Sequence, residues 1–243
     1  MHQVEKLFSW VKEKQKTWLQ PLKKSKDATP CCKICFKEIK CDAFHQIFSN
    51  QTICSNCIKN LKPEFIEFKI KNCKAIAIYR YDDVIKGMIF QYKGCHDYEL
   101  KSVFLNYVKN FLKIMYFSYI IVPMPSYFKD DEIRGYNHVE EIFKELNLKM
   151  EKVLVKNKKH KQSDLNYTER HKVKEVLEAK NAAKIRNKKI LLVDDICTTG
   201  SSLRAAIDIL KEYNPKTIEV LVIAKREFSE EERAKLSEKI EIL

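Results

Sequence analysis

The sequence predicts an α/β fold in which a central, mostly parallel sheet is flanked by helices. The main observation is the apolar run 190–193, which leads through two acids and a hydroxyl-rich loop into a helical pattern after residue 202. The second observation is that further strand-like and helical patterns alternate along the chain. At 243 residues the chain is long enough for one such domain with a small appendage.

Residues 1–30 are predicted to form a basic amphipathic helix followed by a linker. Apolar residues at positions 4, 7, 8, 11, 18, 19 and 22 form a broken helical stripe, and lysines lie on the other faces. We expect this helix to pack on its own domain, although such a helix can also contact a membrane surface or a partner protein. The polar stretch from Pro21 to Pro30 is predicted to be the linker.

Residues 31–62 are predicted to form a zinc-binding knuckle. Cys32 and Cys35 form one Cys-x2-Cys pair, and Cys54 and Cys57 form another after an interval of eighteen residues. Two thiolates in one tight turn can face the same metal, and two such turns supply the four ligands of a closed tetrahedral zinc site. Because catalysis needs an exchangeable ligand, this zinc would be structural.

The choice of zinc ligands has alternatives. Cys31 and Cys41 could each replace a ligand, and His45 is a weaker candidate. A redox pair or reduced core thiols would be the alternative to a metal. The sequence shows neither a secretory signal nor a long apolar run, so we expect a cytoplasmic protein whose nine cysteines are thiols or ligands and not disulfides.

Residues 63–243 are predicted to form the α/β domain itself. Strands are expected at 75–81, 119–122, 153–155, 190–193 and 217–224. Helices are expected at 84–92, 100–115 and 139–146, with a polar helix after Thr168 and a C-terminal helix that Ser229 and Glu232 would cap. The apolar residues of 100–115 keep helical spacing for four turns, so we assign this stripe to the core.

The segment after the strand 190–193 has the composition of a ribose-phosphate site. Asp194 and Asp195 can accept hydrogen bonds from ribose hydroxyls, and the loop 198–202 offers four hydroxyl side chains. Backbone N–H groups at the start of the following helix are unpaired and attract an anion. Gly200 lets the chain turn closely around a ligand. An ordinary helix N-cap beside a solvated acid pair is the alternative interpretation.

This segment resembles the phosphoribosyl pyrophosphate (PRPP) motif of type I phosphoribosyltransferases, and the order of other motifs narrows the resemblance. The chain also contains Val122-Pro123-Met124-Pro125, Arg134-Gly135-Tyr136-Asn137, Gln162-x-x-Leu165 with Arg170, and paired N-terminal cysteines. This order is similar to the ComF family of competence proteins, specifically to ComFC-like chains, over roughly residues 30–225.

The resemblance implies a type I phosphoribosyltransferase fold with an N-terminal four-cysteine zinc knuckle, and PRPP bound together with magnesium. Asp194 and Asp195 would be the catalytic acids that hold the ribose while a nucleophile displaces pyrophosphate. The 5′-phosphate would be bound by Thr198, Thr199, Gly200, Ser201 and Ser202.

The resemblance also implies a second anion site for pyrophosphate, at the turn that contains Pro123 and Met124. Arg134 offers a forked cation for phosphate, and the neighbouring Tyr136 offers a ring that could stack on a base. A helix entry with Asn137 as its cap is the alternative for this motif. Gln162 and Arg170 receive no specific role.

The charge of the chain points to polyanionic partners. Lysine and arginine total 46 against 33 acids, which gives a formal net charge of +13. Nucleic acid, acidic lipid headgroups and polyphosphorylated substrates all suit such a surface. The basic runs at 152–161 and 184–189 could follow the phosphate backbone of single-stranded DNA, or they could simply be solvated faces.

We favour a ComFC-like protein that binds PRPP and single-stranded DNA and takes part in DNA uptake and handling during natural transformation. One alternative is a phosphoribosyltransferase that acts on a small nucleobase or amine. The other is a zinc-dependent interaction module with an inactive PRPP site, which would dock a partner such as a DNA-uptake helicase. No nucleobase-binding hood is evident in the sequence, so the acceptor is not identified.

Overall fold

The structure is a computed structural model that describes residues 31–39, 52–126, 128–156 and 177–227. Several predicted features lie outside these ranges: the helix and linker of 1–30, Cys41, His45, the polar helix after Thr168, Gln162, Arg170, and the C-terminal helix. Among the described residues, no helix combines the length and the apolar character that a membrane crossing requires.

The centre of the fold is a five-stranded sheet with the strand order β1-β2-β7-β6-β3. Its strands are β1 (Ile66–Ile70), β2 (Cys73–Arg80), β3 (Tyr119–Pro123), β6 (Lys189–Cys197) and β7 (Thr217–Lys225). All neighbouring pairs are parallel except β1 and β2, which are antiparallel. This mostly parallel α/β sheet confirms the predicted fold class. The edge strand β1 was not predicted, although apolar residues alternate with charged ones along it.

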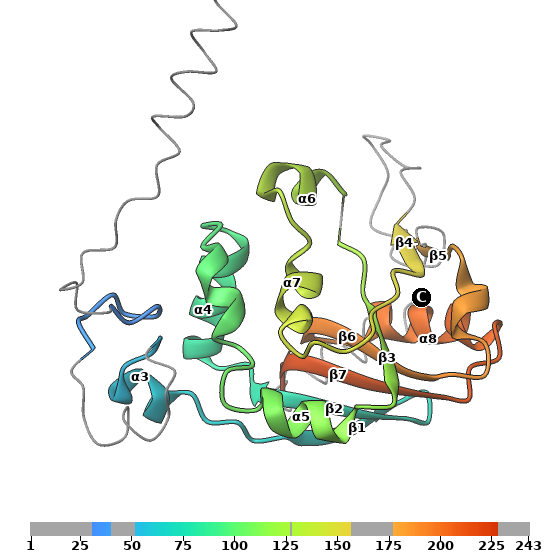
Figure 1. The fold of residues 1–243 in the computed structure, drawn as a ribbon, viewed down its shortest axis with the longest axis horizontal. Coiled ribbons are helices and arrows are strands. Elements are labelled where there is room, and N and C mark those ends of the chain that lie inside the picture. Colours follow the sequence, from blue (N-terminus) through green and yellow to red (C-terminus); the bar gives the residue numbers. More distant parts are fainter. Residues whose placement is uncertain (1–30, 40–51, 127, 157–176, 228–243) are drawn as a thin grey trace, which may run out of the picture.

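Alternation of side chains along β6 explains why the sheet has two apolar faces. Leu191 and Val193 belong to one core, and Ile190 and Leu192 belong to the other. The first core is covered by α3 (Ser55–Asn60), α4 (Asp83–Lys93), the 3₁₀ helix η1 (Tyr98–Ser102), α5 (Lys109–Met115) and α7 (His138–Lys144). The second is covered by η3 (Ala182–Ile185), α8 (Ser201–Lys211) and the hairpin of β4 (Leu154–Lys156) and β5 (Leu177–Ala179). Figure 1 shows α4 and α7 on the same side of the sheet.

The predicted four-turn helix at 100–115 is wrong. The chain instead forms η1, a series of turns and the short α5. Val103, Phe104 and Leu105 are all fully buried, and three consecutive buried side chains leave no solvated face for a surface helix. Backbone bonds with i→i−3 spacing therefore replace the α pattern in this segment. Most of the apolar stripe is core, including the fully buried Leu112 in its second half, whereas Phe111 is 53% exposed.

The helices predicted at 84–92 and 139–146 are confirmed as α4 and α7, and both have side-chain caps. The Asp82 carboxylate accepts a hydrogen bond from the backbone N–H of Ile85, at 2.9 Å. Asn137 likewise accepts from the N–H of Glu140, at 2.9 Å. The helix cap that the sequence offered as one interpretation of Asn137 is therefore present. Between β3 and α7 lies the short helix α6 (Phe128–Arg134).

Candidate PRPP site

The loop between β6 and α8 lies at the C-terminal edge of the sheet, where open α/β sheets bind their ligands. Gly200 has a φ angle of +74°, in the left-handed region, and is the N-cap residue of α8. Its carbonyl accepts the first helical hydrogen bond from the N–H of Arg204, at 2.9 Å. The loop residues 198–202, together with Asp194, line a small cavity of about 60 Å³. The N-terminus of a helix is a place where unpaired backbone N–H groups can bind an anion.

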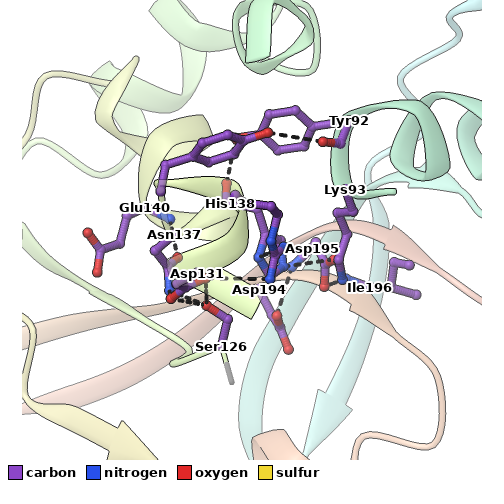
Figure 2. A network of polar contacts seen from close by, with 12 residues as sticks. Tyr92, Lys93, Ser126, Asp131, Asn137, His138, Glu140, Asp194, Asp195 and Ile196 are labelled. Carbon is purple, nitrogen blue, oxygen red and sulfur yellow. Dashed lines mark hydrogen bonds and ion pairs between the residues drawn. The ribbon is translucent and has the colours of Figure 1, made fainter. Parts of the chain in front are cut away.

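Asp194 and Asp195 point to opposite sides of β6 because successive strand residues alternate in direction. Asp195 lies on the side of α4 and α7. Its Oδ2 atom is 2.6 Å from Nζ of Lys93 and 3.2 Å from Nε2 of His138. Asp194 lies on the side of α8, and its Oδ1 accepts only a local bond from the N–H of Asp195 among the contacts of the described residues. Figure 2 shows its carboxylate directed away from Lys93 and His138.

The two carboxyl groups therefore have opposite shifts in pKa. Burial alone would raise the pKa of Asp195, but the hydrogen bond from His138 and the positive charge of Lys93 outweigh this effect and hold the pKa far below its ordinary value. Burial and the negative charge of Asp195 raise the pKa of Asp194 well above its ordinary value. Asp195 is thus a charged carboxylate that is already paired. A positively charged or hydrogen-bonding ligand would stabilise the ionised form of Asp194.

His138 is held in one tautomer by its two neighbours. A guanidinium can only donate, so Nδ1 of His138 accepts from Nη1 of Arg134, at 3.0 Å. The ring proton is therefore on Nε2, where it faces Asp195. Burial lowers the pKa of His138, and the nearby positive charges of Lys93 and Arg134 add to that effect against the opposing influence of Asp195. His138 is consequently a neutral hydrogen-bond bridge between Arg134 and Asp195.

The end of β3 supplies the other wall of the site. β3 is the direct neighbour of β6, and the N–H of Met124 donates to the carbonyl of Val193, at 2.9 Å. A cavity of about 240 Å³ lies between these strand ends, next to the loop 198–202. Its lining includes Lys93, Met124, Ser126, Arg134, His138, Lys156, Asp194, Asp195 and Ser202. Pro123 is the last residue of β3 and pairs with Val193 in the sheet.

The structure thus brings together the predicted loop, the two acids, Met124 and Arg134, and it adds residues that sequence reasoning missed. Lys93 and His138 lie far from Asp195 in the chain, and their contacts exist only because α4 and α7 cover the same face of the sheet. Only one feature of the sequence could have pointed to His138, namely that it directly follows the Arg-Gly-Tyr-Asn motif. Ser126 also lines the 240 Å³ cavity, and its hydroxyl oxygen accepts a hydrogen bond from Nδ2 of Asn137, at 2.6 Å.

Tyr136 has a packing role in this structure. Its ring stacks on Tyr92 at a centroid distance of 5.6 Å, and its hydroxyl donates to the carbonyl of Tyr92, at 3.0 Å. The hydroxyl of Tyr92 in turn donates to the carbonyl of His138, at 3.1 Å. This chain of contacts ties α4 to the start of α7, as Figure 2 shows, and so supports the position of His138.

The basic runs are partly occupied by ion pairs within the protein. Lys152 contacts Glu140, and Lys184 lies 2.9 Å from Glu151. Lys156 differs, because it lines the 240 Å³ cavity together with the acids of β6. Lys158, Lys159 and Lys161 lie outside the described residues. The charge that reaches the site therefore comes from separate elements, namely Lys93, Arg134 and Lys156.

The four predicted cysteine ligands form a compact cluster. The Sγ atoms of Cys32, Cys35, Cys54 and Cys57 all lie within 4.8 Å of one another, so the group could hold a metal ion. Tetrahedral zinc with Zn–S bonds of about 2.3 Å places sulfurs about 3.8 Å apart. The Sγ atoms of Cys35 and Cys54 are 3.8 Å apart. Cys31 is exposed and lies outside this group. The four thiols therefore fit zinc.

Comparisons with known proteins found a matching domain family and a similar competence protein. The family model described as "Phosphoribosyl transferase domain" matches residues 133–241. The chain is 25% identical over 193 residues to the competence protein ComFC of Streptococcus pneumoniae, which covers 76% of this chain and 86% of that protein. This chain is therefore ComFC-like, and its residues 133–241 match the phosphoribosyltransferase domain.

Solved structures similar to this ComFC-like chain include a hypoxanthine phosphoribosyltransferase from Staphylococcus aureus, with 11% identity and a TM-score of 0.36. That match covers 54% of this chain and 69% of the other. Another is the allosteric regulatory enzyme of purine biosynthesis, with 16% identity and a TM-score of 0.33. Here the match covers 51% of this chain and 26% of the other, so this chain spans about a quarter of that enzyme's length.

Proposed function

We propose that this protein binds PRPP at the C-terminal ends of β3 and β6 and uses this site in the handling of single-stranded DNA during competence. The observation that carries the first part is the adjacency of two cavities. The phosphate loop surrounds one, three cations and the two acids line the other, and Asp194 and Ser202 line both. A molecule with a phosphate at one end and a pyrophosphate at the other matches this arrangement.

We infer a role for each residue of the site from its position. The backbone and hydroxyl groups of Thr198, Thr199, Gly200, Ser201 and Ser202 would bind the 5′-phosphate. Asp194, directed toward this loop, would accept hydrogen bonds from ribose hydroxyls, and Asp195 would hold Lys93 in place for the pyrophosphate. Met124 and Arg134 would complete the pyrophosphate side. Carboxylates and phosphates are the oxygen ligands that magnesium prefers, so Asp194 fits a magnesium ion, which would neutralise the leaving group.

Calorimetry with PRPP and magnesium tests the site. We expect wild-type protein to bind PRPP, and the double variant Asp194→Asn/Asp195→Asn to lose detectable binding, because it removes both carboxylates while keeping their shape. Asp208→Asn is a matched control: Asp208 lies on α8 and is 2.6 Å from Nζ of Lys71, away from both cavities. PRPP binding that survives in the double variant would place the ligand elsewhere.

Two observations support the proposed role in DNA handling: the positive net charge of this chain and its similarity to a competence protein. The similar Streptococcus pneumoniae protein is named a competence protein, and this chain carries a net charge of +13. Lys156 reaches the PRPP cavity from β4, at the start of a segment with further lysines. A strand of DNA that follows these lysines would therefore be led toward the site.

Single-strand binding should weaken as salt rises, because lysines displace counterions from the phosphates. Titration of a fluorescent oligonucleotide at several salt concentrations measures the slope of log affinity against log salt. We expect Lys156→Glu to weaken binding by about tenfold, since it removes one phosphate contact and adds a repulsive charge. Lys69→Glu is the control, because Lys69 is an exposed lysine on the edge strand β1. Binding that does not depend on salt would contradict this proposal.

A further inference from the structure

A separate groove of about 400 Å³ lies between α5 and the strands β1 and β2. Figure 1 shows α5 beside these two strands. The groove is lined by Phe65, Glu67, Lys74, Ile76, Tyr107, Val108, Phe111 and Met115. None of these residues lines either cavity of the PRPP site. An inference about this groove therefore does not depend on the proposed function.

The helix α5 and the residues after it present an apolar surface along the groove. Phe111, Ile114, Met115 and Phe117 are between 37% and 76% exposed, and they are four of the nine large apolar side chains exposed in the described part of the chain. Single exposed apolar residues are ordinary on a protein surface, whereas a contiguous patch indicates a site of contact. Because four such residues lie within the segment 111–117, this surface is a candidate for docking.

Phe65 forms the opposite wall of the groove. Its ring meets the ring of Phe111 edge-on, with 5.5 Å between the centroids. The φ angle of Phe65 is +50°, in the left-handed region that a bulky residue seldom adopts. The backbone N–H groups of Glu64 and Phe65 both donate to the carbonyl of Ile78, at 2.8 and 3.2 Å. These bonds hold the strained backbone that places the ring against Phe111, so this wall of the groove is already formed.

The N-terminal segment of the same chain carries an apolar stripe of matching length. Val4, Leu7, Phe8 and Val11 have the spacing of one helical face. A helix extends about 10 Å from residue 4 to residue 11, which is also the length of the seven-residue α5. Two apolar helix faces of this size can pack against each other. We propose that residues 4–11 dock as a helix in the groove between α5 and the strands β1 and β2.

The position of Lys33 favours this segment over a second copy of the chain as the occupant. Nζ of Lys33 lies 3.2 Å from Oγ of Ser102, and Ser102 precedes the groove residue Tyr107 by five positions. Residues 12–30 span about 60 Å when fully extended, so the segment reaches the groove. Such a tether supplies an effective concentration on the order of 1 mM, which supports a weak contact. A stable dimer needs about 800 Å² from each partner, more than the face of a two-turn helix offers.

Tryptophan fluorescence tests the docking directly, because both tryptophans of the chain, Trp10 and Trp18, belong to the N-terminal segment. In wild-type protein we expect a blue-shifted emission that acrylamide quenches weakly and that does not change on dilution. Phe111→Ser/Met115→Ser should weaken docking by at least about tenfold, the effect of losing one large buried apolar side chain, and should move emission and quenching toward those of the unfolded protein. Leu7→Ser/Phe8→Ser should have the same effect while the groove stays intact.

Phe90→Ser is the matched control, because Phe90 is 66% exposed and does not line the groove. Its emission should equal that of wild type. Blue-shifted emission that the Phe111→Ser/Met115→Ser variant retains overturns the inference, as does wild-type emission like that of unfolded protein. In the latter case a blue shift on adding phosphatidylglycerol vesicles would assign the segment to a membrane surface. A blue shift that is lost on dilution, with dimers in sedimentation, would overturn the inference in favour of a second copy.

Discussion

Replacing Cys57 by serine is expected to release the metal from the four-cysteine cluster and to destabilise the whole domain. Cys57 is a buried residue of α3, and its thiolate would be one of four zinc ligands. Cys32, Cys57 and Leu61 belong to the same apolar core as α4 and α7, and Lys33 lies 2.8 Å from Glu99 of η1. Loss of the metal would therefore also destabilise the core that α4 and α7 share with the cysteine segment.

The measurement is elemental analysis combined with thermal unfolding. Wild-type protein should contain about one zinc per chain, and Cys57→Ser close to none. A fall in melting temperature of roughly 10 °C is expected, which for a domain of this size corresponds to about 3–5 kcal/mol. Cys95→Ser is the matched control, because Cys95 is exposed and lies outside the cluster. A well-folded wild-type protein without zinc would show that the four thiols serve another purpose.

Replacing Asp195 by alanine is expected to cost about 2–4 kcal/mol of folding free energy, because it leaves His138 and Lys93 without their shared partner. The cost falls below that of a fully buried ion pair since the Lys93 side chain is 35% exposed. Asp194→Asn should leave stability within about 0.5 kcal/mol of wild type, because the pKa of Asp194 is already raised toward the neutral form. Denaturant unfolding of both variants measures the difference.

The contacts of Asp195 with Lys93 and His138 predict that the folding stability depends on pH. The pKa of Asp195 is lowered in the folded state, so its stabilising contribution is fully present above the unfolded value of about 3.9 and declines as pH falls below it. The stability advantage of wild type over Asp195→Asn should therefore decrease steadily as the pH falls from about 4 to about 2, with part of it still present at the lower end. A stability difference that stays constant over this range would show that Asp195 is not held as a charged partner of Lys93 and His138.

The two adjacent acids would then have separable functions. Asp194→Asn should weaken PRPP binding with little effect on folding, whereas Asp195→Ala should weaken both. Sequence reasoning treated the pair as a single grip on the ribose. The strand places consecutive side chains on opposite faces, so one acid meets α4 and α7 and the other meets the phosphate loop. Equal stability losses in the two variants would contradict this division.

Local pattern was sufficient to predict much of this protein. Apolar strands 75–81, 119–122 and 217–224 were found because buried parallel strands require continuous apolar runs. The loop with Gly200 and the four clustered cysteines were also evident, since the geometry of a tight turn depends on residues a few positions apart. These features were determined by the sequence alone because each is a local property of the chain.

Tertiary structure alone decided which distant residues meet. The stripe at 100–115 has helical spacing, but burial of three consecutive side chains under the sheet required tighter turns than an α-helix makes. No local sequence pattern around Lys93 or His138 indicates that these residues contact Asp195. Such contacts depend on how helices pack across a shared face, a balance of many weak interactions that no short segment of the chain encodes.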